Sequence, residues 1–297
     1  MWQYRAFRAV QWVVERLPRP WAYALAVFGA RVAFLIARTA RQRLEDNLRQ
    51  VLATSDEREL RRITWLNFRN HSKAYADLMQ LPRARVEFLR PLLKLDGLEH
   101  LEAARAVGKG VMVISVHMGS WEIAAAIWSA TIAPVALFAE VLEPRELYDW
   151  YRTTRARLGI SVLPLNRAGL RQVIQALEAQ EMVVTAIDHD VLGTGVVLPF
   201  FGRPARIPIG PAAIAVRRGT PILPVCVYRL ADDSYQAVGL APVLAEPSRD
   251  RNAEARRVTA AVLGKLEAFV RERPDQWHMP HRIWVDQDSP VKAGAAE

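Results

Sequence analysis

The chain has 297 residues, of which 51% are hydrophobic, and a formal net charge of +9 that comes mainly from arginine. This length suits one large α/β domain with a helical addition. The single cysteine excludes a disulfide framework within the chain and fits a reducing compartment, and we expect Cys226 in the core because it lies in an apolar run. Arginine favours an anionic lipid surface as partner. No nucleic acid is expected, because no helix-turn-helix, zinc-finger or RNP-type pattern accompanies the charge.

Residues 1–50 combine apolar, aromatic and basic side chains in the way of a membrane-associating segment. The run Trp21–Ala37 is apolar apart from Arg31, which is short of the roughly 20 apolar residues of a spanning helix. Aromatic residues alternate with arginines over residues 1–14, as in interfacial helices. No cleavable secretory signal is recognisable. We predict a monotopic anchor; a single tilted span and a pair of amphipathic helices packed on the domain are the alternatives.

Periodic segments after residue 50 predict an α/β fold with a central, mostly parallel sheet covered by helices. The apolar spacing predicts helices over residues 55–79, 146–157 and 168–179, and strands over residues 111–116, 135–139, 160–164, 182–187 and 221–229. Proline and glycine crowd residues 193–211, which predicts a structured loop over the site. We therefore expect an N-terminal helical, membrane-associating region at 1–90, an α/β domain at 91–286 and a flexible tail at 287–297.

The most informative stretch is the apolar run that starts at Val111 and ends on His117, with Glu122 five positions later. Gly119 and Ser120 are turn and N-cap residues, so a strand, a turn and a helix are predicted in succession. Such a corner allows Glu122 to fold back toward the imidazole, which suits a general base held by a carboxylate. The N–H groups at the start of the helix would point at the same place and meet an anion or a developing oxyanion.

Four blocks of the sequence, in order, resemble the bacterial lipid A biosynthesis acyltransferases, a branch of the lysophospholipid acyltransferase superfamily. The first is His-Met-Gly-Ser-Trp-Glu at 117–122, an H-x4-E motif whose usual form in that branch is His-Phe-Gly-Asn-Trp-Glu. The other blocks are Asp-His-Asp at 188–190 with Gly-Val-Val-Leu-Pro-Phe-Phe-Gly-Arg-Pro-Ala at 195–205, the segment 210–225, and Arg-Pro-Asp-Gln-Trp at 273–277 with His-Arg-Ile-Trp at 281–284. The likeness extends from an early Arg-x3-Asn47-Leu to about residue 285.

The resemblance implies an acyltransferase that moves a fatty acyl chain from an acyl carrier protein or coenzyme A thioester to a hydroxyl of a membrane glycolipid or phospholipid, with a lipid A precursor favoured. It implies no cofactor beyond that thioester, and a place on the cytoplasmic face of the bacterial inner membrane. The run Ile-Pro-Ile-Gly-Pro at 207–211 also resembles relatives that acylate phosphatidylinositol mannosides, although those often carry Asp in place of Glu122. A lysophospholipid acyltransferase, a hydrolase using the same corner and a basic lipid-binding protein without chemistry are the alternatives.

The resemblance makes His117 and Glu122 the catalytic pair. It also suggests that Arg203 and Arg206, beside Gly202, hold an acceptor phosphate. The substrate-binding residues that we predict are Gly202, Arg203, Arg206, Arg157, Asp188 and Asp190. The Asp-His-Asp run, with His278 and His281 downstream, is compatible with a metal site, but neighbours on a strand point to opposite faces and the superfamily needs no metal, so we expect none.

Overall fold

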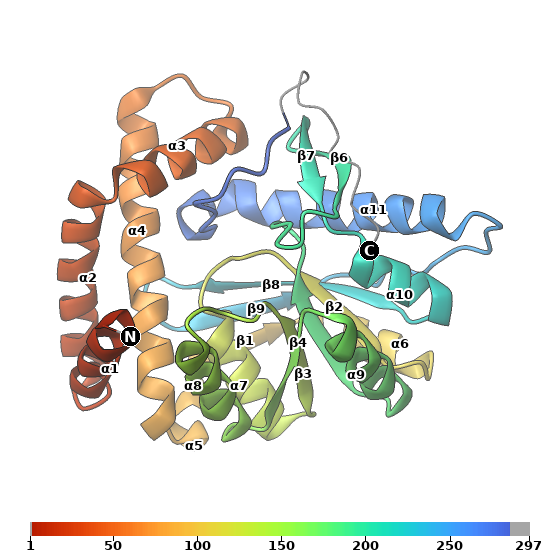
Figure 1. Cartoon of the computed structure of the whole chain (residues 1–297), viewed down its shortest axis with the longest axis horizontal. Helices are drawn as coiled ribbons and strands as arrows, with labels where there is room; N and C mark the ends of the chain where they lie inside the picture. Colours follow the sequence, from red (N-terminus) through yellow and green to blue (C-terminus); the bar gives the residue numbers. More distant parts are fainter. Residues whose placement is uncertain (1, 286–297) are drawn as a thin grey trace.

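The computed structural model describes residues 2–285, and its N-terminal part is helical (Figure 1). The helices here are α1 (Trp2–Val14), α2 (Arg19–Ile36), α3 (Arg38–Leu52), α4 (Glu57–Gln80) and the short α5 (Val86–Leu89), with 3-10 turns at Leu81–Arg83 and Arg90–Leu92. The helix predicted over 55–79 is α4, which begins after Asp56, whose carboxylate accepts the N–H groups of Arg58 and Glu59. The tail predicted at 287–297 lies outside the described residues.

Helix α2 packs along α4 and is long and apolar enough to cross a membrane by length and composition, with a mean hydropathy of 1.2 over its 18 residues. Its buried residues, among them Tyr23 and Phe34, face the rest of the protein. The opposite face carries exposed apolar side chains: Trp21, Leu25, Phe28, Val32, Leu35 and Ile36. Helix α2 is therefore an apolar N-terminal helix with one covered and one uncovered face.

All five runs predicted as strands lie in one seven-stranded sheet of order β1-β9-β8-β2-β5-β3-β4. Its strands are β1 (Leu93–Asp96), β2 (Val111–Ser115), β3 (Val135–Ala139), β4 (Ile160–Pro164), β5 (Met182–Ala186), β8 (Ile222–Arg229) and β9 (Tyr235–Gly239). Strands β8, β2, β5, β3 and β4 are parallel, whereas β9 runs antiparallel to β8 and parallel to β1 at the edge. The predicted fold class, a mostly parallel sheet covered by helices, is confirmed.

Alternate residues of β2 enter two different cores, which places a helical layer on each face of the sheet (Figure 1). Met112 and Ile114 pack with α9 (Arg167–Glu178), α10 (Gly210–Arg218) and α11 (Arg251–Glu272). Val111 and Val113 pack with α6 (Leu98–Ala106), α7 (Trp121–Thr131) and α8 (Arg145–Ala156). The cysteine at 226 is buried in the first of these cores, as predicted.

The loop prediction for residues 193–211 is wrong in its middle part, where an antiparallel hairpin forms from β6 (Val196–Phe200) and β7 (Arg203–Ile207). Phe201 and Gly202 form its two-residue turn, with φ of 49° and 76°. Two positive φ angles suit the twist of a hairpin, but residues with such angles are usually glycine or asparagine. Because Phe201 occupies the first of these positions, the sequence shows no recognisable hairpin turn. Because this ribbon is separate from the main sheet, its prolines interrupt no central ladder.

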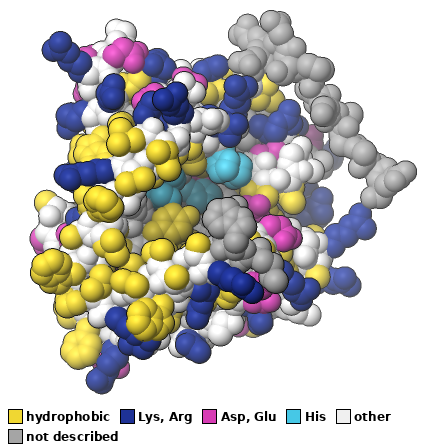
Figure 2. Space-filling view, turned by 60° about the vertical axis from the view of Figure 1, so that its left-hand side comes forward, with side chains coloured by type: hydrophobic (Ala, Val, Ile, Leu, Met, Phe, Trp, Pro, Cys, Tyr) yellow, Lys and Arg dark blue, Asp and Glu magenta, His cyan; other side chains and the backbone are white. Residues whose placement is uncertain are grey.

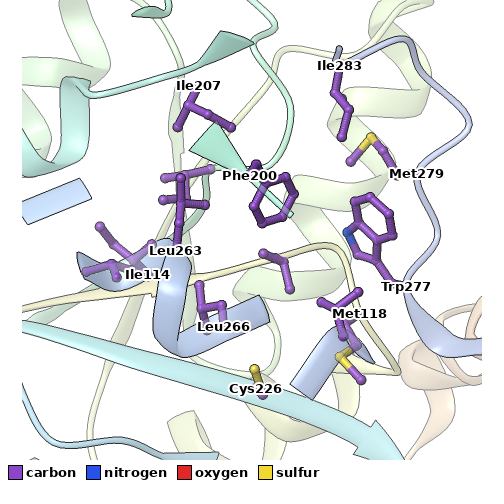
Figure 3. Packing of buried hydrophobic residues seen from close by; sticks show 14 of the residues in the cluster. Ile114, Met118, Phe200, Ile207, Cys226, Leu263, Leu266, Trp277, Met279 and Ile283 are labelled. Atoms are coloured by element: carbon purple, nitrogen blue, oxygen red, sulfur yellow. The ribbon is translucent and has the colours of Figure 1, made fainter. Parts of the chain in front are cut away.

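The hairpin, the C-terminal segment and β2 share one apolar cluster (Figure 3). Phe200 lies with its ring centroid 5.9 Å from that of Trp277, and both side chains are fully buried. Met118, Met279 and Ile283 complete the packing around the indole. This cluster holds the segment after the 3-10 turn Pro274–Gln276 against the end of β2, where His117 lies.

Candidate active site

His117 follows β2 in a tight turn that requires a glycine at position 119. Gly119 has φ +65°, and a Cβ atom there would lie 2.2 Å from the carbonyl oxygen of Val227. Its N–H donates to the carbonyl of Gln276 at 3.1 Å, and the N–H of His278 donates to the carbonyl of His117 at 3.0 Å. The turn is thus held between β8 and the C-terminal segment, and it places His117 at the carboxyl end of the parallel strands.

Asp188 is the carboxylate that holds the His117 ring. The parallel register pairs Ser115 with Ala186, so the residues two positions further along each strand emerge side by side. The Nδ1 atom of His117 lies 2.7 Å from Oδ1 of Asp188, and the backbone N–H of His117 donates to Oδ2 at 2.8 Å. The indole N–H of Trp277 donates to the same Oδ2 at 2.8 Å. Asp188 is fully buried, and three donors define its orientation.

These contacts assign the tautomer and the charge of the pair. A carboxylate only accepts, so Nδ1 carries the proton and Nε2 presents its lone pair. Burial by itself lowers the pKa of His117, but the charge and the hydrogen bond of Asp188, assisted by Glu140, raise it above the ordinary value. Burial would raise the pKa of Asp188, but His117 and the indole of Trp277 lower it, so the carboxylate stays ionised. The pair has the geometry of a general base and its orienting carboxylate.

Five histidines line the cavity around this pair, and four of them have pKa values below the ordinary range. Burial is the main cause for each, and the other histidines add to it. The ring of His71, with its pKa lowered to about 3, stacks on His278 with centroids 3.4 Å apart. His189 stacks on His281 at 4.1 Å. Of these five rings, only His117 has its pKa raised, because the charge and the hydrogen bond of Asp188 favour its protonated form.

Glu122 does not hold the His117 ring, so that part of the prediction is wrong. Its carboxylate lies in the first turn of α7 and accepts two hydrogen bonds from Arg155 of α8, at 2.5 and 3.2 Å. Both side chains are 8% exposed. The guanidinium also lies over the ring of Trp121, 5.1 Å from its centroid. The buried ion pair ties α8 to the start of α7, because Trp121 and Glu122 are the first residues of that helix.

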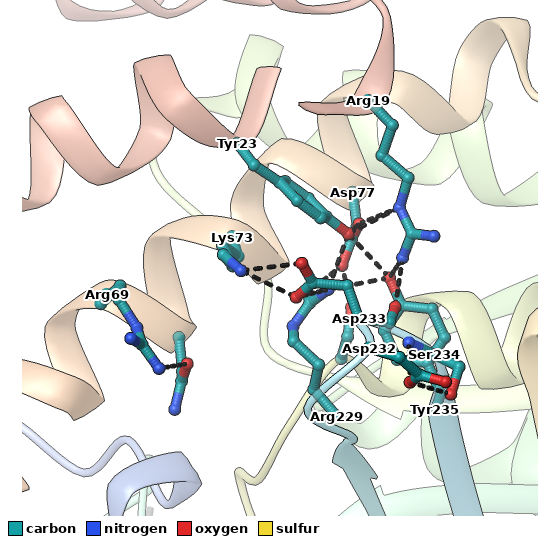
Figure 4. Close-up of polar contacts among 12 residues, drawn as sticks. Arg19, Tyr23, Arg69, Lys73, Asp77, Arg229, Asp232, Asp233, Ser234 and Tyr235 are labelled. Carbon is teal, nitrogen blue, oxygen red and sulfur yellow. Dashed lines mark hydrogen bonds and ion pairs between the residues drawn. The ribbon is translucent and has the colours of Figure 1, made fainter. Parts of the chain in front are cut away.

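A buried polar cluster joins α2 and α4 to β8 (Figure 4), and one of its members also reaches Ser120 of the same turn. Asp77 of α4 accepts from the hydroxyl of Tyr23 at 2.6 Å and pairs with the guanidinium of Arg229 from β8. Its second oxygen also accepts from Oγ of Ser120 at 2.8 Å. Ser120 is the N-cap of α7, yet its hydroxyl makes no capping bond. The cluster therefore directs the capping hydroxyl away from the helix.

The backbone N–H groups of Trp121 and Glu122 have no acceptor among residues 2–285. Both residues border the cavity that contains His117. Unpaired N–H groups at a helix start form a binding site for an anion or an oxyanion. That these N–H groups meet an oxyanion beside His117 stays a prediction.

Two asparagines hold the C-terminal segment against the site. Asn67 of α4 donates to the carbonyl of Trp277 at 2.7 Å, and its own carbonyl oxygen lies 2.7 Å from Nδ1 of His278. Asn47 of α3 donates to the carbonyls of Met279 and His281 at 2.6 and 2.9 Å. These buried bonds satisfy backbone acceptors of a segment that has no regular structure.

The cavity around His117 has a volume of about 1580 Å³ and divides into two arms. One arm extends beneath the sheet toward α7 and is lined by a single row of residues from four adjacent strands, Val113, Leu137, Val184 and Leu223. It also reaches Met182, six residues before the level of His117, or about 20 Å along a strand. The other arm lies between α9 and α10. Figure 2 shows histidine side chains at the bottom of a hollow bordered by hydrophobic residues.

Comparison with known proteins agrees with this geometry. The sequence model of the family described as bacterial lipid A biosynthesis acyltransferase matches residues 1–286. The chain belongs to this family. It is therefore an acyltransferase, and the family implies a lipid acceptor and an acyl donor.

Curated relatives of the acyltransferase fall into two groups by acceptor. A phosphatidylinositol mannoside acyltransferase of Mycobacterium tuberculosis (strain CDC 1551 / Oshkosh) is 28% identical over 292 residues, which cover 92% of this chain and 90% of the relative. The protein of that name from Mycolicibacterium smegmatis is 26% identical over 269 residues, or 90% and 86% of the two chains. A lipid A biosynthesis lauroyltransferase of Escherichia coli (strain K12) is 25% identical over 280 residues, or 92% and 88%.

The arginines that the sequence suggested for the acceptor phosphate do not line the cavity of the acyltransferase. Arg203 lies with its guanidinium 5.7 Å from the ring centroid of Trp284, and Arg206 donates to the carbonyl of Gly195 at 3.2 Å. Gly202 forms the hairpin turn, and Arg157 is exposed at the end of α8. The basic residues that do line the cavity are Arg155, Arg167, Arg217, Arg218 and Arg229.

The two predicted aspartates have different positions. Asp188 lies beneath the His117 ring and is completely buried, so it contacts the base and no substrate. Asp190 does line the cavity; one of its oxygens accepts the N–H of Gly195 at 2.8 Å, and the other is buried without a partner in the described part of the chain. The sequence carried a partial signal for Asp188, a carboxylate just past a predicted strand, but the position of that strand beside β2 comes from the structure. Trp277 and Asn67 left no comparable signal.

Proposed function

We propose that the acyltransferase moves a fatty acyl chain from an acyl thioester to a hydroxyl of a membrane glycolipid, with His117 as the general base. The observation that carries this proposal is the Asp188–His117 pair, whose free Nε2 borders the cavity. Nε2 removes the proton from the acceptor hydroxyl, and the oxygen attacks the thioester carbonyl. Collapse of the tetrahedral intermediate breaks the C–S bond, and the imidazolium returns the proton to the leaving thiolate. No acyl-enzyme and no cofactor beyond the thioester co-substrate are needed.

The start of α7 supplies the second element of the mechanism. The unpaired N–H groups of Trp121 and Glu122 stabilise the negative charge that develops on the carbonyl oxygen. Glu122 contributes through its ion pair with Arg155, which fixes the first turn of α7, and so acts as a positioning residue. Removing one oxyanion donor typically costs about 10²–10³ in rate, so the precise placement of this turn matters as much as the base.

The size of the cavity supports two substrates. A volume of about 1580 Å³ exceeds the roughly 300–1,000 Å³ of an ordinary small-molecule site. We assign the arm beneath the sheet to the acyl chain, because its row of Val113, Leu137, Val184 and Leu223 presents only apolar surface. Burial of each methylene there contributes about 0.8 kcal/mol, which gives the enzyme a means to select chain length.

The N-terminal helices bring the enzyme to its lipid acceptor. The exposed face of α2 carries large apolar side chains, with Trp21 69%, Phe28 64% and Leu35 67% exposed. Figure 2, in which the end of the molecule with α1 and α2 comes forward, shows many hydrophobic side chains on this side. Such a contiguous patch is typical of a membrane contact. We propose a monotopic attachment to the cytoplasmic face of the inner membrane, where anionic lipid attracts the arginines of residues 1–50.

Two acceptor classes deserve a direct test. The family description and the lauroyltransferase favour a lipid A precursor; the mycobacterial relatives favour a phosphatidylinositol mannoside as a second candidate. The purified enzyme is incubated with a labelled acyl thioester and each acceptor in mixed vesicles. Acylated lipid supports the transferase, free fatty acid indicates a hydrolase, and the absence of turnover indicates a binding protein. The acceptor with the higher kcat/KM identifies the class.

A pair of variants tests the base within that assay. His117→Ala should reduce transfer by about 10²–10⁴. The matched control is His100→Ala, because His100 is a partly exposed histidine on α6 that does not line the cavity. Near-normal turnover of a folded His117→Ala protein contradicts the mechanism.

A further inference from the structure

The second arm of the cavity leads away from His117 between two helices on the other face of the sheet. Leu170 and Ile174, four residues apart on α9, form one wall. Ala213, Ile214 and Arg217, on one side of α10, form the opposite wall. From the start of α10 to Arg217 the helix rises about 10 Å. The arm is therefore a groove rather than a widening of the site, with apolar sides and a basic outer end.

Arginines gather where this groove reaches the surface. Arg217 and Arg218, in the last turn of α10, line its outer end, and Arg218 pairs with Glu178, the last residue of α9, at 3.1 Å. Arg217 also borders a neighbouring surface depression of about 590 Å³, which is further lined by Arg249, Asp250, Arg251 and Asn252. The Asp250 carboxylate there accepts two backbone N–H groups of α11.

The groove opens on a different side of the molecule from the apolar helices. In Figure 1, α1 and α2 lie at one end of the fold, whereas α9 and α10 lie at the other. A membrane lipid reaches His117 from the apolar side. A water-soluble donor needs another entrance, because its polar carrier cannot enter the bilayer region. A groove with apolar sides that ends in two arginine side chains fits a slender chain that terminates in a phosphate.

We propose that the α9–α10 groove holds the 4′-phosphopantetheine arm of the acyl donor and that Arg217 and Arg218 bind its phosphate. The proposal rests on the proposed function, in that the bound thioester is the one His117 uses. Coenzyme A and acyl carrier protein share this phosphopantetheine, so the groove suits both. Arg249 and Arg251 add positive charge just outside, where either a nucleotide phosphate or an acidic carrier surface would lie.

The first test is binding, because it does not depend on the acceptor. Calorimetry measures the affinity of the full chain for two non-reactive donors, an S-alkyl coenzyme A and an S-alkyl carrier protein. Each donor that the wild-type protein binds should bind at least tenfold more weakly to the variant Arg217→Ala/Arg218→Ala. The reason is that each lost charge-assisted hydrogen bond weakens binding by about tenfold or more. Arg256→Ala is the matched control, because Arg256 is an exposed arginine of α11 that lines neither hollow. Unchanged affinity in the double variant, or no binding of either donor to the wild-type protein, overturns the proposal.

Kinetics with a truncated donor then separates phosphate recognition from general damage. The double variant should raise the KM of acyl coenzyme A or acyl carrier protein while leaving kcat and the KM of an acyl-pantetheine without phosphate unchanged. An equal rise for acyl-pantetheine contradicts a phosphate site. The variant Arg249→Ala/Arg251→Ala then distinguishes the two donors, coenzyme A and acyl carrier protein. It should weaken the binding of the physiological donor more than the binding of the other donor. Donor binding that is retained without any acyl transfer would contradict the proposed function and leave the groove assignment intact.

Discussion

Asp188→Asn should inactivate the enzyme through the tautomer of His117 rather than through loss of structure. Two of the three donors that reach Asp188, the N–H groups of His117 and Trp277, converge on Oδ2 at 2.8 Å each. The amide oxygen must therefore occupy the Oδ2 position, which places the amide NH₂ at the Oδ1 position, 2.7 Å from Nδ1. An NH₂ group donates, so Nδ1 must accept and the ring proton moves to Nε2. A protonated Nε2 cannot remove the proton of a hydroxyl.

The expected loss is that of a general base, about 10²–10⁴ in kcat, or about 2.7–5.4 kcal/mol of transition-state stabilisation. The substrate KM values should change little, because Asp188 is buried beneath the ring. The pH profile provides a second readout. Activity requires unprotonated His117, so the acid limb of kcat/KM in the wild-type enzyme should lie above the ordinary histidine pKa, since Asp188 raises it. Removing that charge leaves burial, which lowers the pKa of His117, so the remaining activity should have its acid limb at lower pH.

The assay is acyl transfer from a labelled thioester between about pH 5 and 9, with thermal unfolding as the check on folding. Trp277→Phe is the control: it removes one bond to Oδ2 and keeps the ring packing and the Nδ1 contact. Its kcat should fall by about tenfold, in line with the loss of one hydrogen bond to a charged group at the low end of its range, and so by less than the kcat of Asp188→Asn. A folded Asp188→Asn enzyme with normal kcat, or with an unshifted acid limb, refutes the role of Asp188 in orienting the base.

Three further variants examine the surroundings of the site. Glu122→Gln leaves Arg155 buried without its partner, so the free energy of unfolding should fall by roughly 3–5 kcal/mol together with kcat; a stable protein with normal kcat would show that the pair positions nothing. Gly119→Ala should abolish activity and destabilise the fold, because its Cβ would lie 2.2 Å from a carbonyl oxygen of β8. Gly193→Ala is the control: its φ is similar and no atom lies within 4 Å of its Cβ, so its free energy of unfolding in a denaturant titration should fall far less. Phe28→Asp should weaken sedimentation with anionic vesicles without changing acyl transfer from a soluble thioester to a detergent-dispersed acceptor, and undiminished binding would argue against α2 as the contact.

Much of the fold follows from local patterns that the sequence carries by itself. The apolar runs of β2, β3, β4, β5 and β8 could be recognised because strands buried on both faces need apolar residues on both, and all five are strands of the sheet. Helix α4 could be delimited from its N-cap and its apolar spacing. The position of His117 at a strand end followed from the turn residues Gly119 and Ser120. The hairpin β6–β7 could not be recognised, because its turn places Phe201 at a positive φ that tertiary packing of the aromatic ring stabilises.

The partners of these residues, by contrast, depend on contacts between distant parts of the chain. Because Glu122 lies only five positions after His117, the sequence suggested it as the partner of that histidine. In the structure Glu122 lies in the first turn of α7 and pairs with Arg155 of α8 instead. The partner is Asp188, 71 positions away, because β2 and β5 are parallel neighbours and strand order is not encoded in either strand alone. Trp277, from the C-terminal segment, reaches the site through its hydrogen bond to Asp188, and Asn67, from α4, holds the Trp277 carbonyl. Sequence by itself determined the type of chemistry and the runs that form β2, β3, β4, β5 and β8, and it predicted His117 as the base. Only the tertiary structure decided which carboxylate lies against that histidine, because hydrogen bonds act over about 3 Å whatever the separation in sequence.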